Sequence, residues 1–284
     1  IEDIPPANLD ECFANGEIAV IAGFQGVTTK QRITTLGRGG SDTSAVAIAA
    51  AVKGACDIYT DVDGVYTTDP RFVPDARRLQ TVTFEEMLEM ASLGSKVLQI
   101  RSVEFAGKYR VRLRVLSSLT DPMMPIEQEA GSGTLITFEE DSNMEQAIIS
   151  GIAFNRDEAK ITVMGVPDRP GIAYAILGPV GDANIDVDMI IQNASVDGMT
   201  DFSFTVHRGE YQKALDVLNS QVKAHIQATD IRGDNRICKV SLVGVGMRTH
   251  AGIASKMFRT LSEEGINILM ISTSEIKISV VIDE

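Results

Sequence analysis

The chain has 284 residues, which is long enough for two or three domains that each bury a hydrophobic core. With 44% hydrophobic and 23% charged residues, its composition is that of an ordinary soluble globular protein. The formal net charge of −13 argues against a nucleic-acid partner, because such a partner requires a basic surface. No apolar run approaches the roughly 18 residues of a membrane-spanning helix, so we expect no membrane partner either.

The cysteines and histidines are few and scattered. Cys12, Cys56 and Cys238 are odd in number and lack the C-x-x-C spacing, which favours reduced thiols in the cytoplasm over a disulfide framework. The three histidines are equally dispersed, and we predict no metal site built on them. The chain opens on Ile1 rather than Met and closes on a strand-like run, so we expect an interior piece of a longer protein.

A glycine-rich segment, residues 35–45, is the main feature of the first third of the chain. Residues 18–22 before it read as a buried strand, and the Ala-rich run 44–52 after it has helical character, with the Ser41–Asp42 pair as candidate N-caps. A glycine loop that opens a helix points free N–H groups and the positive end of the helix dipole at one spot, which suits a phosphate or a carboxylate. Arg38 adds a guanidinium that can bind such a group through two hydrogen bonds.

A second candidate site for phosphate groups follows. Residues 56–62 form an apolar run that ends in acidic residues, and the Asp-Gly pair after them is a turn signal. In open α/β sheets, ligands bind at the carboxyl ends of the strands. Asp61 and Asp63 are therefore candidates for holding Mg²⁺ through water or for binding ribose hydroxyls, and Arg71 and Lys96 for contacting phosphate oxygens.

Helices and strands alternate through the rest of this region. A capping box that begins at Thr83 predicts a helix over residues 84–91, and a second helix is expected over residues 95–109. Residues 111–116 and 134–138 read as strands. This alternation predicts an α/β fold with a mostly parallel sheet covered by helices.

The remainder of the chain contains two copies of one unit. Residues 160–166 match residues 239–245, and after a short insertion Gly171 matches Gly252. Each copy reads strand, glycine turn, helix, strand and a further strand, which is typical of a small ferredoxin-like α+β unit. Two such units can pack side by side and form a joint sheet.

Several motifs are long enough to compare with known families. They are residues 35–43, 59–71, 84–87 and 94–98, and in the repeats residues 165–171 and 271–276. These motifs closely resemble aspartate kinase, an amino-acid kinase with tandem ACT domains, and the resemblance covers essentially the whole chain. It implies a partial amino-acid-kinase type sheet, with its N-terminus missing, over residues 1–140. Two α+β ferredoxin-like ACT domains would follow over residues 147–226 and 237–284, the second incomplete at its C-terminus.

The resemblance implies ATP-dependent phosphorylation of the side-chain carboxylate of L-aspartate to 4-phospho-L-aspartate, the first step towards lysine, threonine and methionine, with Mg²⁺ as cofactor. Asp42 would position a catalytic lysine. The aspartate substrate would be held by Arg38, Gly39, Gly40 and Ser41. The ATP site would be lined by Thr60, Asp61, Tyr66, Thr67, Thr68, Asp69, Pro70, Arg71 and Lys96. The family's opening Lys-Phe-Gly-Gly-Thr-Ser segment is absent, so we expect this piece alone to be inactive.

The resemblance also implies feedback inhibition by lysine, threonine or both, bound between ACT domains of two chains. The chain would then form a homo-oligomer, a homodimer in the simplest case, or pair with an ACT-only subunit. The effector residues of the first repeat would be Asp168, Gly171, Ala173, Ile185, Asp186, Val187, Gln192, Asn193 and Ser195. Those of the second repeat would be Ile266, Asn267, Ile268, Thr273 and Glu275.

Two alternatives stay open at this point. The chain could act as a non-catalytic ACT-type regulatory subunit, since Met144 offers an internal start just before the first repeat. It could also belong to another amino-acid kinase, such as glutamate 5-kinase. The motifs between Gly37 and Lys96 argue against the first alternative, and the pair of ACT units argues against the second.

Overall fold

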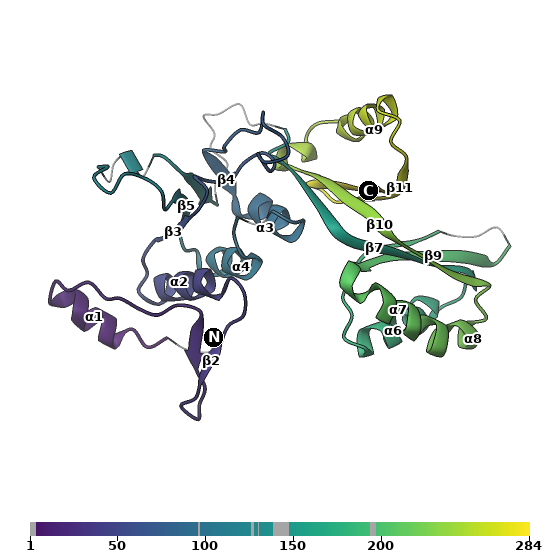
Figure 1. The fold of residues 1–284 in the computed structure, drawn as a ribbon, viewed down its shortest axis with the longest axis horizontal. Helices are drawn as coiled ribbons and strands as arrows, with labels where there is room; N and C mark the ends of the chain where they lie inside the picture. Colours follow the sequence, from purple (N-terminus) through teal and green to yellow (C-terminus); the bar gives the residue numbers. More distant parts are fainter. Residues whose placement is uncertain (1–3, 96, 126–127, 130, 139–147, 194–196) are drawn as a thin grey trace. The chain divides into compact units, whose positions relative to one another are not determined.

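The computed structural model describes the chain except for residues 1–3, 96, 126–127, 130, 139–147 and 194–196 (Figure 1). Its residues group into two compact units. The first comprises residues 1–153, 242–251 and 275–277, and the second comprises residues 154–241, 252–274 and 278–284.

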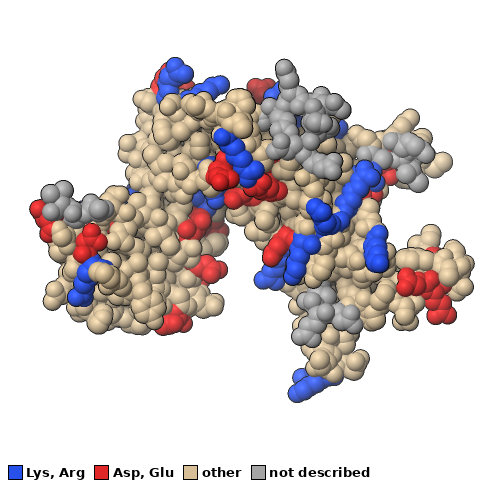
Figure 2. Space-filling view, turned by 180° about the vertical axis from the view of Figure 1, so that it is seen from behind, with Lys and Arg blue, Asp and Glu red and all other residues tan. Residues whose placement is uncertain are grey.

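In the described parts of the chain, no helix has both the length and the apolar character needed to cross a membrane. On the face drawn in Figure 2, basic and acidic side chains both occur, and several of them lie next to one another.

The first unit is an α/β structure built on a four-stranded sheet of order β3-β5-β6-β4. The pairs β3–β5 and β4–β6 are parallel, and β5–β6 is antiparallel, so the sheet is mixed but mostly parallel. Its elements in chain order are α1 (Ala7–Ala14), β1 (Gln25–Val27), β2 (Ile33–Thr35), α2 (Gly40–Ala51), β3 (Cys56–Thr60), β4 (Thr81–Thr83), α3 (Phe84–Ser92), α4 (Ile100–Tyr109), β5 (Leu113–Ser117) and β6 (Thr134–Thr137).

Helices α2, α3 and α4 cover this sheet and share its hydrophobic core (Figure 1). Val46 of α2, Met87 of α3 and Val103 of α4 are fully buried in one cluster with Val115 of β5. Helix α4 lies between the other two, because both α2 and α3 pack against it. The predicted sheet covered by helices is therefore confirmed.

Two local expectations were wrong. Residues 18–22 form no strand, and Ile18 and Val20 are 90% and 95% exposed, because among the described residues no strand lies alongside to pair with them. The neighbouring strands β1 and β2 pair with each other instead, in an antiparallel hairpin. Helix α4 begins at Ile100 rather than near residue 95, because Gln99 has extended backbone angles and caps the helix.

One buried carboxylate in the first unit is bound by three segments of the chain. Glu86, only 3% exposed, lies in the first turn of α3. Its Oε2 accepts hydrogen bonds from the backbone N–H and the hydroxyl of Thr83, which confirms the predicted capping box. Its Oε1 accepts from the Ser150 hydroxyl at 2.5 Å and from the Val245 backbone N–H at 3.0 Å. Glu86 thus joins α3 to Ser150 and Val245, which follow it in the chain by 64 and 159 positions.

The second unit, together with parts of the first, contains both repeats in one six-stranded sheet of order β11-β12-β10-β7-β9-β8. The two repeats therefore do form a joint sheet, as such units can. The elements of the first repeat are β7 (Gly151–Pro167), α6 (Ile172–Asp182), β8 (Val187–Gln192), β9 (Met199–His207), η1 (Arg208–Glu210), α7 (Tyr211–Val217), η2 (Leu218–Val222) and α8 (Lys223–Ile226). Those of the second are β10 (Asp230–Val243), η3 (Val245–Arg248), α9 (Ile253–Glu263), β11 (Ile268–Thr273) and β12 (Lys277–Asp283).

The two long strands at the centre of the joint sheet hold the repeats together. Strand β7 has 17 residues and β10 has 14, whereas a strand in a globular protein typically has about 5–6. The edge strands β8 and β11 lie at opposite ends of the strand order. Even so, Met189 of β8 and Met270 of β11 belong to one buried cluster with Ile237 and Val281. The sheet must therefore curve strongly, as twisted sheets do.

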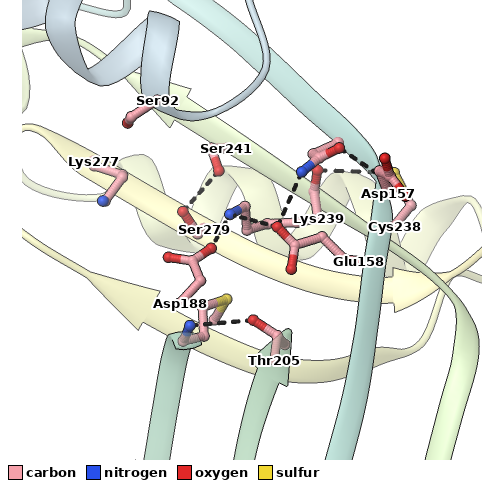
Figure 3. A network of polar contacts seen from close by, with 12 residues as sticks. Ser92, Asp157, Glu158, Asp188, Thr205, Cys238, Lys239, Ser241, Lys277 and Ser279 are labelled. Atoms are coloured by element: carbon pink, nitrogen blue, oxygen red, sulfur yellow. Dashed lines mark hydrogen bonds and ion pairs between the residues drawn. The ribbon is translucent and has the colours of Figure 1, made fainter. Parts of the chain in front are cut away.

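A buried lysine in the second unit has two acidic partners (Figure 3). Lys239 of β10 is 3% exposed, and its Nζ lies 3.0 Å from Oε1 of Glu158 on β7 and in direct contact with the carboxylate of Asp188 on β8. Burial acts to lower the pKa of Lys239, but the hydrogen bond to Asp188 and the negative charges of both carboxylates outweigh it and raise the pKa. The charged lysine therefore links strands β7, β8 and β10 of the sheet through ion pairs.

The contacts of Glu86 predict the effect of removing it. In Glu86→Ala, the Ser150 hydroxyl and the Val245 N–H lose a buried acceptor, so we expect the free energy of unfolding to fall by about 3–4 kcal/mol in urea titrations. Glu85→Ala is the matched control, because Glu85 pairs with Arg248 on the surface and should contribute less than about 1 kcal/mol. Equal losses in the two variants would contradict the buried carboxylate's role.

Lys239→Met should destabilise the second unit by about 3–5 kcal/mol, because Glu158 then stays buried without a cation. In the unmodified protein the pKa of Lys239 is raised on folding, so its contribution is fully present below the unfolded-state pKa of about 10.4 and is lost as the pH rises through the folded-state value. Urea midpoints measured from pH 7 to 11 should fall at the alkaline end for the unmodified protein. The same alkaline fall in Lys239→Met would show that another group causes it.

Candidate active site

The glycine-rich segment forms a tight loop between β2 and α2. Gly37 and Gly39 both have left-handed backbone angles, with φ of 82° and 72°. Gly39 is the N-cap residue of α2, which begins at Gly40. The loop therefore delivers the chain directly into a helix N-terminus, as the sequence predicts.

Only glycine fits at position 39. A Cβ there would lie 2.3 Å from Cγ of Gln99, well below any normal contact distance, and the left-handed backbone would add strain. At position 37 the left-handed φ alone favours glycine, because a Cβ would meet nothing within 4 Å among the described residues.

Asp42 lies in the first turn of α2 rather than at its cap. The cap is Gly39, and among the described residues no side-chain hydrogen bond caps this helix, so the prediction that Ser41 or Asp42 caps it was wrong. Burial raises the pKa of Asp42, and a hydrogen bond from the backbone N–H of Gln99 acts in the opposite direction. The carboxylate is half-buried and stands beside the starts of both α2 and α4.

Arg38 and Ser41 are exposed on the loop. Within the part of the chain that the structure describes, no carboxylate forms an ion pair with Arg38. Its guanidinium is thus available for an anionic ligand, next to the N–H groups at the start of α2.

The acidic turn lies where the sequence places it, after β3. Strand β3 ends at Thr60, which pairs with Ser117 at the end of the parallel strand β5, so this is the carboxyl edge of the two strands. The Tyr66 hydroxyl donates to Oδ1 of Asp63 at 2.9 Å, and this hydrogen bond raises the pKa of Tyr66. Arg78 lies 3.6 Å from the other oxygen of Asp63.

The remaining residues of this segment are held by local contacts. Arg71 forms a two-point ion pair with Asp69, at 3.0 and 2.7 Å, while its side chain stays 76% exposed. The Thr67 backbone N–H donates to the Arg77 carbonyl, and the Thr67 hydroxyl accepts from the Arg77 backbone N–H. The Asp69–Arg71 pair therefore presents an exposed guanidinium in a fixed geometry.

The residues present are compatible with a Mg–nucleotide. Among the described residues, no group of three or more His, Cys, Asp or Glu side chains could hold a metal ion alone. Mg²⁺ that accompanies a nucleotide needs only one or two carboxylates beside the phosphates, and Asp61 and Asp63 are both exposed in the turn. These two carboxylates are the candidates for that role.

The structure brings together part of the predicted site. Gly39 and Asp42 meet at Gln99, and Asp63, Tyr66, Asp69 and Arg71 share the acidic turn. No hydrogen bond or ion pair within the described residues joins these two groups, and Lys96 lies outside those residues. Sequence reasoning missed Gln99 and Arg78, since nothing local marks either residue as a partner of Gly39, Asp42 or Asp63.

The predicted effector residues of the first repeat surround the start of α6 and the end of β8. Gly171 caps α6 with a φ of 89°, and the backbone N–H of exposed Asp168 donates to Gly198 at 2.8 Å. Ile185 is only 4% exposed and packs in the hydrophobic cluster beneath. Five more residues are exposed or partly buried: Ala173, Asp186, Val187, Gln192 and Asn193. Ser195 lies outside the described residues.

In the second repeat, Gly252 caps α9 with a φ of 90°, so the predicted strand–glycine–helix pattern holds in both copies. The predicted effector residues Ile266 and Asn267 are exposed before β11, Ile268 is its first residue, and Thr273 is its last. Glu275 is exposed and its carboxylate lies 3.3 Å from Nε of Arg248.

Comparison with known proteins agrees with this organisation. The amino acid kinase family model matches residues 1–117, and two ACT domain models match residues 160–222 and 240–284. An aspartate kinase of Pseudomonas putida is 65% identical over 270 residues, which cover 95% of this chain and 63% of that protein. An aspartokinase of Helicobacter pylori is 46% identical over 287 residues, covering 100% of this chain and 68% of that protein.

Solved structures give the same result. Clostridium acetobutylicum aspartate kinase is 25% identical, with a TM-score of 0.80 over 93% of this chain and 59% of that one. E. coli aspartokinase III in complex with aspartate and ADP is 27% identical, with a TM-score of 0.75 over 98% and 60%. The chain spans less than two thirds of the length of the Pseudomonas putida relative. With its kinase-type sheet, its glycine loop and its two ACT repeats, the chain belongs to the aspartokinase family.

Proposed function

We propose that the protein from which this chain comes is an aspartate kinase. It transfers the terminal phosphoryl group of ATP to the side-chain carboxylate of L-aspartate and forms 4-phospho-L-aspartate. The product is the precursor of lysine, threonine and methionine, and lysine, threonine or both inhibit the enzyme through the ACT domains. The same proposal places the partial kinase domain at residues 1–140, the first ACT domain at residues 147–226 and the second at residues 237–284.

The observation that carries this proposal is the glycine loop. It combines an exposed Arg38, left-handed glycines and a helix N-terminus at one place, which suits the carboxylate of an amino acid. The likeness to E. coli aspartokinase III, whose structure contains aspartate and ADP, supports it. The half-buried Asp42 next to the loop is placed to orient a cationic group beside the substrate.

A carboxylate nucleophile is already ionised at neutral pH, so the protein needs no general base for it. Its task is to position the two substrates and to neutralise charge on the transferring phosphoryl group. Arg38 and the loop N–H groups bind aspartate, whereas Arg71, Tyr66 and the carboxylates of the acidic turn bind the nucleotide. Mg²⁺ held by Asp61 or Asp63 would neutralise phosphate charge when bound.

The ACT repeats supply the regulatory part of the proposal. The helix N-termini at Gly171 and Gly252 suit the carboxylate of an amino-acid effector, and Asp168 or Glu275 suits its ammonium group. The effector pocket would lie between repeats of two chains, in a homodimer or with an ACT-only subunit. An effector that prefers one arrangement of the chains then shifts the equilibrium between active and inactive forms.

The direct test is an assay of the full-length protein with ATP, Mg²⁺ and a panel of amino acids. Phosphorylation of L-aspartate, detected as the hydroxamate of its acyl phosphate, is expected. Phosphorylation of glutamate instead would point to another amino-acid kinase, and no turnover with any amino acid would point to a regulatory subunit.

Arg38→Ala should raise the KM for aspartate strongly. Loss of a charge-assisted two-point contact costs about 2–4 kcal/mol of transition-state stabilisation, which is roughly 30-fold to 1000-fold in kcat/KM. Arg32→Ala is the control, because Arg32 is exposed in the hairpin before the loop. Initial rates over a range of aspartate and ATP concentrations check this prediction. If only the KM for ATP rises, the glycine loop does not bind aspartate.

Ala173→Phe should relieve feedback inhibition. Ala173 is partly buried in the first turn of α6, so a phenyl ring there would fill the space proposed for the effector. We expect the concentration of lysine or threonine for half-inhibition to rise on the order of tenfold or more, which corresponds to about 1.4 kcal/mol, with the uninhibited kcat nearly unchanged. Tyr174→Ala, at an exposed neighbouring position, is the control. Sedimentation should show an intact oligomer, and unchanged inhibition would contradict the pocket.

A further inference from the structure

Gln99 contacts both the glycine loop and α4, and no part of the proposed mechanism uses it. Its Oε1 accepts hydrogen bonds from the backbone N–H groups of Arg101, at 2.5 Å, and Ser102, at 3.3 Å. Its backbone carbonyl accepts from the buried Ser102 hydroxyl at 2.6 Å. Gln99 is therefore a complete N-cap for α4.

The aliphatic part of the same side chain lies against the glycine loop. The Cγ and Cβ atoms of Gln99 occupy the positions that a side chain at residue 39 would need, 2.3 and 2.7 Å from an ideal Cβ. The left-handed backbone at Gly39 thus rests directly on this side chain. Movement of Gln99 would free the residue from which α2 starts.

The main chain of Gln99 makes a third contact. Its backbone N–H faces the Asp42 carboxylate in the first turn of α2 and acts to lower the pKa of that carboxyl, against the larger effect of burial. One residue thus contacts the loop through carbon atoms, Asp42 through its N–H, and the first turn of α4 through its amide oxygen. Helices α2 and α4 pack against each other, so these contacts hold two helix N-termini in register.

We propose that Gln99 is a positioning residue that holds the glycine loop and Asp42 in their binding geometry relative to the start of α4. This inference rests on the proposed function, because it assigns to Gln99 the affinity of that loop for an amino-acid substrate. Gln99 does not contact the substrate itself. It keeps Gly39 and Asp42 in place, so that Arg38 and the N–H groups of α2 converge on the same carboxylate.

A capping role alone does not explain glutamine at this position. Ser, Thr, Asp and Asn are the preferred N-cap residues, and their shorter side chains suffice for the first-turn amides. None of them has a Cγ methylene that would pack on Gly39. Glutamine satisfies both demands, since its amide oxygen caps α4 while its methylene groups support the loop.

Two substitutions in the full-length protein separate packing from capping. Gln99→Ser keeps a good cap but removes Cγ, so thermal stability should stay within about 1 °C while the KM for aspartate rises on the order of tenfold and the KM for ATP changes less than about twofold. Gln99→Met keeps Cγ but lacks the acceptor, so it should lower the melting temperature by several degrees and recover most of the affinity for aspartate.

Thr83→Ala is a matched control for stability, because it deletes the N-cap of α3 in the same unit without touching the loop. It should lower the melting temperature and leave both KM values unchanged. The inference is overturned if Gln99→Ser has the unmodified KM for aspartate, or if KM follows melting temperature across the three variants. If the unmodified full-length protein phosphorylates no amino acid, the proposed function fails first and this inference fails with it.

Discussion

The burial of charged side chains in each unit constrains the rest of the structure. A buried charge is tolerated only when partners compensate for its lost hydration, and those partners must come from well-defined places. Glu86 takes its partners from the start of its own helix, from Ser150 and from Val245. Lys239 takes its partners from β7 and β8. Because these partners are distant in sequence, each charge fixes a long-range arrangement that hydrophobic burial alone would leave less specific.

The same principle applies on a smaller scale at the glycine loop. Glycine adopts the left-handed backbone at position 39 at little cost, but it has no side chain that could anchor the loop. Gln99 supplies the missing contact from another helix and at the same time caps that helix. In the proposed function this loop presents N–H groups to a small anion, and the contact with Gln99 gives it rigidity without placing a side chain in the space proposed for the ligand.

Local patterns in the sequence predict local structure well and long-range contacts poorly. The Thr83–Glu86 capping box and the strand–glycine–helix order of the repeats appear as predicted, because each depends on residues a few positions apart. Residues 18–22 have an equally good strand pattern, yet a strand also requires a neighbour, which the pattern cannot supply. The roles of Gln99 and of Glu86 as a partner of Val245 depend on contacts between distant segments, and nothing near either residue indicates them.

The two repeats share one pattern but differ in what holds their turns. At the end of the first strand in the first repeat, the backbone N–H of Gly165 donates to Asp201 of the same repeat. In the second repeat, one position after the matching Gly244, the N–H of Val245 donates to Glu86 of the kinase-type unit. Arg248, in the same turn, contacts both Glu85 and Glu275. The hydrogen bond at Gly165 thus stays within the first repeat, whereas any rearrangement of the turn at Val245 must either move α3 or break a hydrogen bond to a buried carboxylate.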